Sequence, residues 1–335
     1  MKKDLHVGIL IHPELEPNTK KIYYTKKQRF KCPSITEWDI WRACRQLYKK
    51  VSIISLPDSL TELSKSLRHS QVDIVINLTE EFKGDQTKDC MVANALERSN
   101  IPFVGGNAHS LKISRNKVKI KKILDSSNVD VPEKYNGKNF PVILKLINAD
   151  ASLGISKRNI VFNHEDYLER KKILEERYCQ KAFAEEFVSG REIFISIWKD
   201  KNGKLIFNKP RELIFKKSKK PSQEIFTERY KWSYDFQKKM GIQTKSAKLN
   251  RSEIKKFKEI SFELYNELQL SSHVRFDFRY SDKGIFLIDV NSNPNLAKDD
   301  DFALSYSKSY KHLINELVES SLKMHSSKKK FSIAS

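Results

Sequence analysis

The chain has 335 residues, of which 39% are hydrophobic and 31% charged, and its formal net charge is +21. This is the balance of a soluble globular protein with two or three subdomains, and the longest apolar runs, residues 7–11 and 142–146, suit buried strands and exclude a membrane-spanning helix. The positive charge would suit a nucleic-acid partner, but the lysines are dispersed and form no RNA-binding signature, so nucleic acid is not expected. The same positive charge would attract an anionic substrate such as ATP.

The cysteines and the start of the chain point to a reducing compartment. The four cysteines show no C-x-x-C spacing, which argues against a zinc site or a disulfide framework. The basic start, Met-Lys-Lys, is followed by Asp4, His6 and only a short apolar segment, which argues against a secretory signal. We therefore expect a cytoplasmic protein.

The first third of the chain alternates between strand and helix patterns. Strands are predicted at residues 5–11, 51–56, 72–78 and 101–104, and helices at 35–49, 60–67 and 93–98, with a polar, proline-containing loop after the first strand. Ser34 is available as the N-cap of the first helix. This alternation predicts a parallel sheet.

The next segment combines a lysine-rich helix with a buried strand. A helix is predicted from Ser110 towards Pro132, and it carries Lys117. Residues 140–147 form an apolar strand with one charge, Lys145, which is costly to bury unless it reaches a partner, and phosphate is the expected counter-charge. The small-residue loop 148–156, with Ser152 and Gly154, could fold its N–H groups over phosphates as a lid.

Strand and helix patterns continue to the end of the chain. They predict strands at 182–188, 192–198 and 205–208, a mobile loop at 215–223, helices at 252–268 and 306–322, and a disordered tail from residue 324. Tyr230-Lys231-Trp232 lies between the mobile loop and the long helix.

Residues 272–295 place oxygen ligands in register on a hairpin. Apolar and polar residues alternate from Val274 to Tyr280, and a turn at 281–284 leads into a second strand. The pattern assigns Phe286, Ile288 and Val290 to the apolar face, and Leu287, Asp289 and Asn291 to the polar face. Asp277, Asp289 and Asn291 then share one surface beside Arg275, which suits Mg²⁺ with its phosphate ligands. An amphipathic hairpin with a charged outer face is the alternative.

These residues resemble a known family. The pattern R-x-D-F followed by D-V-N-x-x-P is similar to the metal-binding end of ATP-grasp carboxylate–amine ligases, most closely their D-alanine–D-alanine ligase-like branch, and VINLTEEF (75–82) and IPFVGG (101–106) support the resemblance. It implies an α/β ATP-grasp fold with three subdomains: a Rossmann-like one at 1–110, a central lid subdomain at 111–190 and a C-terminal catalytic one at 191–323, before a tail at 324–335.

The resemblance also implies roles for individual residues. Lys117 and Lys145 would contact ATP phosphates, with Asn116 replacing an aspartate of the family, and Ser152 and Gly154 match the lid, whose usual Arg-Glu-Gly is here residues 148–150. Glu185 and the backbone of Glu186–Val188 would serve adenine, and Glu192 the ribose. The implied catalytic residues are Arg275 and Lys231, with Arg229 as an alternative to Lys231, and the metal ligands are Asp277, Asp289 and Asn291.

The implied reaction transfers the γ-phosphoryl group of ATP to a carboxylate, and an amine then attacks the acyl phosphate, with Mg²⁺ or Mn²⁺ as the metal. The substrates would be a small carboxylate and a small amine, such as amino acids or a peptide, and a homodimer is left open. D-alanyl-D-alanine is not the expected product, because the family's amino-acid pocket residues are replaced near Glu14, Glu16, 78–81 and Asn295. A non-catalytic nucleotide-binding module is the alternative function.

Overall fold

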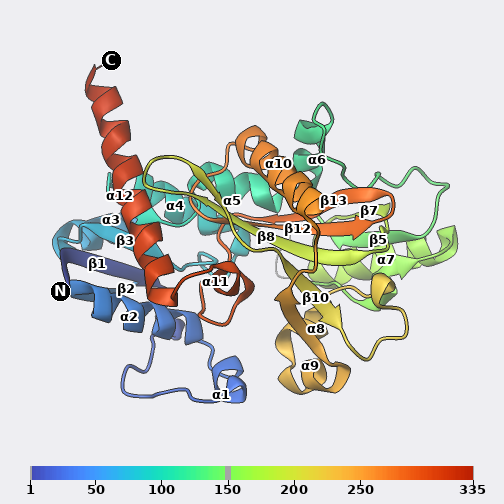
Figure 1. Ribbon diagram of the computed structural model, residues 1–335, viewed down its shortest axis with the longest axis horizontal. Helices are drawn as coiled ribbons and strands as arrows, with labels where there is room; N and C mark the ends of the chain where they lie inside the picture. Colours follow the sequence, from blue (N-terminus) through green and yellow to red (C-terminus); the bar gives the residue numbers. More distant parts are fainter. Residues whose placement is uncertain (1, 148–151, 335) are drawn as a thin grey trace.

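The structure, a computed structural model, describes residues 2–147 and 152–334 and contains three β-sheets that follow one another along the chain (Figure 1). Within the described residues, no helix combines the length and the apolar character that a membrane span requires.

The first sheet is parallel, as predicted, in the order β2-β1-β3-β4. Its strands are β1 (Lys3–Ile11), β2 (Tyr48–Ser55), β3 (Ile74–Asn77) and β4 (Phe103–Val104). One face packs on α2 (Ile35–Leu47) and on the last helix, α12 (Tyr310–Ala334), and the other face on α3 (Leu60–Ser70) and α4 (Asp89–Arg98). Successive residues on β1 point to opposite faces, so Ile9 faces α2 and Leu10 faces α3.

The central sheet is small and antiparallel, in the order β6-β5-β7. It consists of β5 (Val142–Leu146), β6 (Ile160–Val161) and β7 (Ala182–Glu186). Val142, Leu144 and Leu146 pack with α7 (His164–Tyr178) in one cluster, so the alternate residues of β5, Ile143 and Lys145, face the other way.

The third sheet is antiparallel, in the order β11-β10-β8-β12-β13, with β9 beside β8. Its strands are β8 (Arg191–Lys199), β9 (Leu205–Phe207), β10 (Arg211–Phe215), β11 (Ile242–Ser246), β12 (Val274–Ser281) and β13 (Gly284–Asn291). One face is covered by α10 (Arg251–Glu267), α5 (Ala108–Arg115) and α6 (Lys117–Leu124). The opposite face therefore carries Arg275, Asp277 and Asp289.

The remaining elements are short helices in the connections. They are α1 (Lys26–Phe30), α8 (Glu228–Trp232), α9 (Tyr234–Met240), α11 (Asp301–Ser305), and the 3-10 turns η1 (Pro13–Leu15), η2 (Gln86–Lys88), η3 (Lys157–Asn159) and η4 (Pro221–Gln223). Helix α1 lies within the segment that the sequence predicts to be a loop.

Several predicted elements differ from the structure. The helix predicted from Ser110 is two helices, because Asn116 ends α5 and caps α6, where its side chain accepts a bond from the N–H of Lys119 at 2.8 Å. The tail predicted to be disordered from residue 324 is helical through Ala334, since no Pro or Gly follows Tyr310 to end α12. Ser34 is the N-cap of α2, as predicted, but its side chain makes no capping bond.

The second strand of the hairpin also differs from its predicted alternation. Asp277 pairs with Asp289 but Phe278 pairs with Leu287, so Ile288 is an extra, bulged residue on β13. Leu287 and Ile285 consequently lie in the core, where Phe286 and Ile288 were expected, while Val290 is buried as predicted. The bulge still leaves Asp289 and Asn291 on the predicted face.

Candidate active site

The predicted site residues meet in one cavity of about 520 Å³ between the central and C-terminal sheets. All of them line it except Gly154: the lining includes Lys117, Lys145, Ser152, Glu185, Glu186, Val188, Glu192, Lys231, Arg275, Asp277, Asp289 and Asn291. These residues come from both sheets, from α6 and α8, and from the loop after β5. The cavity is the candidate active site because charged groups from distant parts of the chain converge there.

The carboxylates of the hairpin each have a basic partner. Arg275 donates to Asp277 from Nε to Oδ1 at 2.7 Å and from Nη2 to Oδ2 at 2.9 Å. Lys117 Nζ lies 3.1 Å from Asp289 Oδ1. Burial raises the pKa of Asp277, Arg275 opposes this, and the charge of Asp289 adds to it. The two adjacent acids therefore favour a bound cation.

The donor set fits Mg²⁺. Asp277 and Asp289 face each other across the ladder, and Asn291 pairs with Arg275 two residues further along. Within the described part of the chain there is no cluster of three His, Cys, Asp or Glu side chains for a metal, but Mg²⁺ needs only one or two carboxylates when phosphate and water complete its shell. The three residues stay the predicted ligands.

Lys145 has a protein counter-charge, which differs from the expectation of phosphate alone. Its Nζ lies 2.6 Å from Oε1 of Glu185, whose Oε2 lies 2.5 Å from Nζ of Lys121. Glu185 is only 2% exposed, and although burial raises the pKa of its carboxyl, the two lysines lower it below the ordinary value. Glu185 thus holds Lys145 at the cavity wall, and its role at adenine stays a prediction.

The link between β7 and β8 leaves few free backbone donors for a base. The N–H of Glu186 donates to Glu133 O at 2.8 Å, and that of Phe187 to Pro141 O at 3.0 Å. Val188 lines the cavity and is the remaining residue of the predicted adenine segment. Glu192, the predicted ribose ligand, is 7% exposed and pairs with Arg279 Nη2 at 3.0 Å.

The loop after β5 is fastened to α8. Gly154, at φ +71°, donates its N–H to Glu228 Oε2 at 3.1 Å and does not line the cavity, so its prediction as a phosphate ligand is not supported by its position. Ser152, at φ +61°, does line it. The predicted lid residues 148–150 lie outside the described residues.

Lys231 and Arg229, the two alternatives for a catalytic cation, have different surroundings on α8. Lys231 lines the cavity, whereas the guanidinium of Arg229 stacks 4.1 Å from the ring centre of Phe236. Among the two candidates, the structure places Lys231 at the site.

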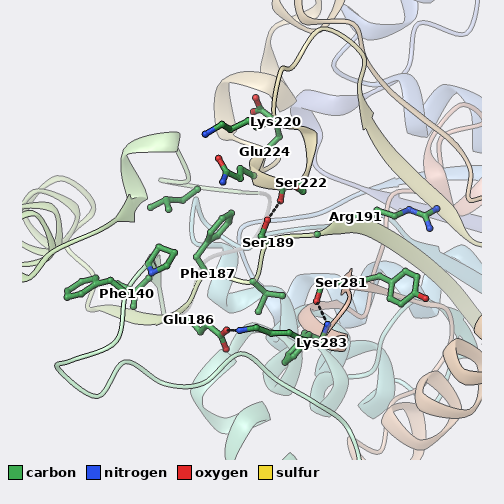
Figure 2. A pocket seen from close by; sticks show the side chains of 18 of the residues that line it. Phe140, Glu186, Phe187, Ser189, Arg191, Lys220, Ser222, Glu224, Ser281 and Lys283 are labelled. Carbon is green, nitrogen blue, oxygen red and sulfur yellow. Dashed lines mark hydrogen bonds and ion pairs between the residues drawn. The ribbon is translucent and has the colours of Figure 1, made fainter.

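A second, larger groove of about 1520 Å³ lies behind the β7–β8 link (Figure 2). Glu186 pairs there with Lys283 at 3.0 Å, and Ser189 donates to Ser222 O at 3.0 Å. Of the predicted site residues, only Glu186 and Val188 line it. We assign the chemistry to the smaller cavity, because convergent charge and not volume marks a reactive site.

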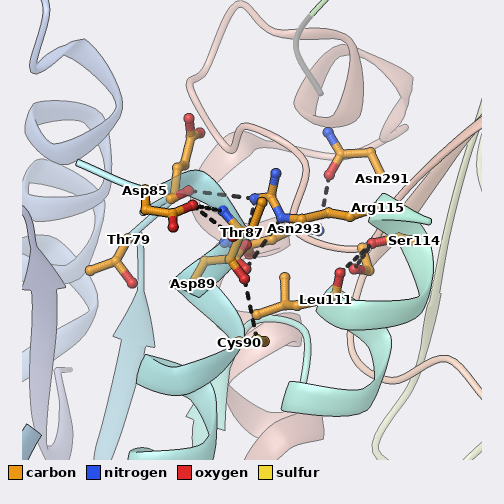
Figure 3. Close-up of polar contacts among 12 residues, drawn as sticks. Thr79, Asp85, Thr87, Asp89, Cys90, Leu111, Ser114, Arg115, Asn291 and Asn293 are labelled. Atoms are coloured by element: carbon orange, nitrogen blue, oxygen red, sulfur yellow. Dashed lines mark hydrogen bonds and ion pairs between the residues drawn. The ribbon is translucent and has the colours of Figure 1, made fainter. Parts of the chain in front are cut away.

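Several cavity residues were missed by the sequence reasoning. Arg115 on α5 donates from Nη2 to Asp89 Oδ2 at 2.6 Å and lies beside the loop after β13 (Figure 3). Arg279 is 4% exposed and holds Glu192; it is the third polar residue of the β12 alternation, a signal that could have found it. Glu80, Arg115 and Asp300 carry no such local signal.

Known proteins are similar to this chain in sequence and in fold. The family described as D-ala D-ala ligase C-terminus matches residues 116–319. The D-alanine–D-alanine ligase of Wigglesworthia glossinidia brevipalpis is 27% identical over 279 residues, which cover 76% of this chain and 73% of that protein.

Solved structures share the whole fold. The D-alanine–D-alanine ligase from Bacillus anthracis complexed with ATP superposes with a TM-score of 0.70 at 17% identity, covering 97% of this chain and 99% of that one. The VanG D-Ala:D-Ser ligase from Enterococcus faecalis superposes with a TM-score of 0.65 at 15% identity, covering 95% and 100%. These identities establish the fold alone.

Proposed function

We propose that this chain, which belongs to the ATP-grasp family of D-alanine–D-alanine ligase-like proteins, joins a carboxylate and an amine that are not both D-alanine. Proteins of this family are ATP-dependent, ADP-forming carboxylate–amine ligases. The observation that carries this proposal is a contrast within one cavity. The cavity keeps the predicted Lys117, Lys145, Arg275 and Asp289 in its lining, whereas Glu14 and Glu16, which could have held an amino-acid substrate, do not line it.

The groups expected to hold amino-acid substrates are displaced or changed. Glu14 and Glu16 are exposed and do not line the cavity. Glu80, in the replaced segment 78–81, does line it. Asn295 accepts bonds through Oδ1 from Thr36 Oγ1 at 2.9 Å and from the N–H of Ala297 at 2.7 Å, so its side chain is committed to protein contacts beside the reaction centre.

The charged residues of the cavity would have different roles in the reaction. Arg275 and Lys117 now neutralise Asp277 and Asp289, and they would turn to the phosphates when a metal takes their place at the carboxylates. Lys145, held by Glu185, would contact a phosphate without reorganising. Asp277, Asp289 and Asn291 would hold Mg²⁺ or Mn²⁺, which would supply electrophilic polarisation of the phosphates.

The experiment is ADP release measured with Mg²⁺ and ATP across a panel of carboxylates and amines, with product masses determined for each active pair. Turnover that requires both a carboxylate and an amine supports the proposal. ATP binding without turnover for any pair favours the nucleotide-binding module instead. Light scattering of the same sample would measure the oligomeric state, which the sequence leaves open.

A further inference from the structure

Asp300 lies at the cavity wall, and one oxygen of its carboxylate, Oδ1, has no hydrogen-bond partner among the described residues. It is the N-cap residue of α11, where an aspartate ordinarily accepts a bond from the first turn, but its side chain makes no capping bond. Its Oδ1 atom is buried and accepts no hydrogen bond from any described residue. Asp300 also lines the cavity that holds Arg275 and Lys231, so this carboxylate faces the substrate space.

The acids on either side of Asp300 are already neutralised. Asp299 accepts two bonds from Arg29, from Nε at 2.9 Å and from Nη2 at 2.8 Å. Asp301 accepts one from Nε of Arg211 at 3.2 Å. Arg275 is occupied by Asp277. Among the described residues Asp300 is therefore the acid of this trio that forms no close ion pair, although the charges of Arg275 and Lys231 reach it.

The groups around Asp300 raise the pKa of its carboxyl. Burial and the charge of Asp301 raise the pKa of Asp300 to about 6, although Arg275 and Lys231 oppose the shift. An anionic group bound here would meet like charge, since Arg29 and Arg211 are already paired. A cationic group would neutralise Asp300 and complete its hydrogen bonds.

We propose that the amine substrate carries a positively charged group besides the amine that reacts, and that Asp300 binds this group. The inference rests on the proposed function and narrows its substrate class to diamines, guanidino amines or similar cations. The carboxylate substrate is the less suitable ligand, because its reacting end is attracted to the basic phosphate end of the cavity, whereas the amine gains nothing from Lys117 or Arg275 and needs a separate anchor.

The test compares binding of 1,4-diaminobutane and 1-aminobutane, which differ in one cationic group, to the full chain with Mg²⁺ and a non-hydrolysable ATP analogue. Calorimetry on the wild type should show about 10- to 100-fold tighter binding of the diamine. Asp300→Asn, which keeps the side-chain shape, should remove this preference. Asp58→Asn, at an exposed aspartate outside the cavity, should leave it unchanged.

Equal affinity of the wild type for the two amines, or a preference that survives in Asp300→Asn, would overturn the inference. The panel of carboxylates and amines separates this result from failure of the proposed function. Turnover confined to amines without a second positive charge overturns the role of Asp300 but keeps the ligase activity. A cationic preference on the carboxylate substrate instead of the amine also overturns it.

Discussion

Asp277 and Asp289 face each other directly across β12 and β13, one residue away from the bulge at Ile288. The bulge turns Leu287 into the core and keeps Asp289 in the cavity. Two carboxylates are thereby held side by side on adjacent strands, where a rigid sheet fixes their spacing.

We expect Asp289→Ala to lower ATP turnover by at least about 100-fold, because it removes a predicted anionic ligand of the metal. The Asp289 side chain is 32% exposed, so the free energy of unfolding should change by less than about 1 kcal/mol. ADP release over a Mg²⁺ titration and urea unfolding measure the two effects. Asp282→Ala, at the exposed turn of the same hairpin, is the matched control. Near-normal Mg²⁺-dependent turnover in Asp289→Ala would contradict the metal assignment.

Lys145→Met should weaken both ATP binding and the fold. It leaves the buried Glu185 with Lys121 alone, which should cost on the order of 1–3 kcal/mol, and it should raise the KM for ATP about tenfold or more. Adding Glu185→Gln should recover part of the stability without recovering ATP affinity. Recovery of both in the double variant would show that Lys145 serves only the fold.

The same ion pair predicts a pH dependence. The pKa of Glu185 is lowered in the folded protein, so the stability that its carboxylate contributes is present above its ordinary pKa and is lost as the pH falls through the lowered value. The destabilisation by Lys145→Met should therefore shrink in acid, which urea unfolding at pH 7 and pH 3 would measure. A constant difference between the two pH values would contradict the assigned charge.

Local patterns were sufficient to predict much of the fold and several side chains that meet in the candidate cavity. The strict alternation of Val274 to Tyr280 identified the strand that carries Arg275 and Asp277, and the lone charge in β5 identified Lys145. Both signals depend on neighbours in sequence, because a strand of period two assigns each residue to a face.

Long-range contacts could not be predicted in this way. The partner of Lys145 is Glu185 on β7, joined by Lys121 from α6, and no local pattern specifies such a triad. Helix α12 packs on the first sheet although it follows the third, and the bulge at Ile288 reverses an otherwise regular alternation. Asp300 is distinguished by a buried Oδ1 atom that no described residue hydrogen-bonds, which only the folded structure can reveal.

Glu37 on α2 should make stability fall as the pH rises. It is 4% exposed, and burial, with a smaller contribution from Glu80, raises the pKa of its carboxyl to about 7. A raised folded pKa contributes stability that is present below the ordinary value of about 4.5 and is lost as the pH rises through 7, by roughly 3 kcal/mol in all. Urea unfolding from pH 4.5 to 8 should show that Glu37→Gln lacks this loss. Glu62→Gln, at an exposed position of α3, should keep it.

Gly106 should be required for the position of the loop after β13. A Cβ at this residue would lie 2.6 Å from the main-chain oxygen of Ser292, so Gly106→Ala should displace the loop that follows Asn291, cost about 1–3 kcal/mol and lower turnover. Gly137 has φ +89° and open space around it, so Gly137→Ala tests backbone strain without a clash. Both variants should lose stability, but only Gly106→Ala should lose turnover. Normal turnover in Gly106→Ala would show that the close contact between Gly106 and Ser292 is not needed for the activity of the site.

The final prediction is that D-alanine alone is not a productive substrate. Two molecules of D-alanine would place a carboxylate of the accepting molecule in a cavity that also holds the carboxylate of Asp300, whose Oδ1 accepts no hydrogen bond from a described residue, and Glu14 and Glu16 are too exposed to hold the ammonium group of the first. Asn295 adds a side chain, hydrogen-bonded to Thr36, to the lining of the cavity. With ATP, Mg²⁺ and D-alanine, we therefore expect dipeptide formation far below about one per second, an ordinary turnover for an enzyme on its own substrate. The ligase of Wigglesworthia glossinidia brevipalpis, assayed alongside, verifies the conditions, and dipeptide formed at the ordinary rate would establish that these changes leave the substrate pocket functional for D-alanine.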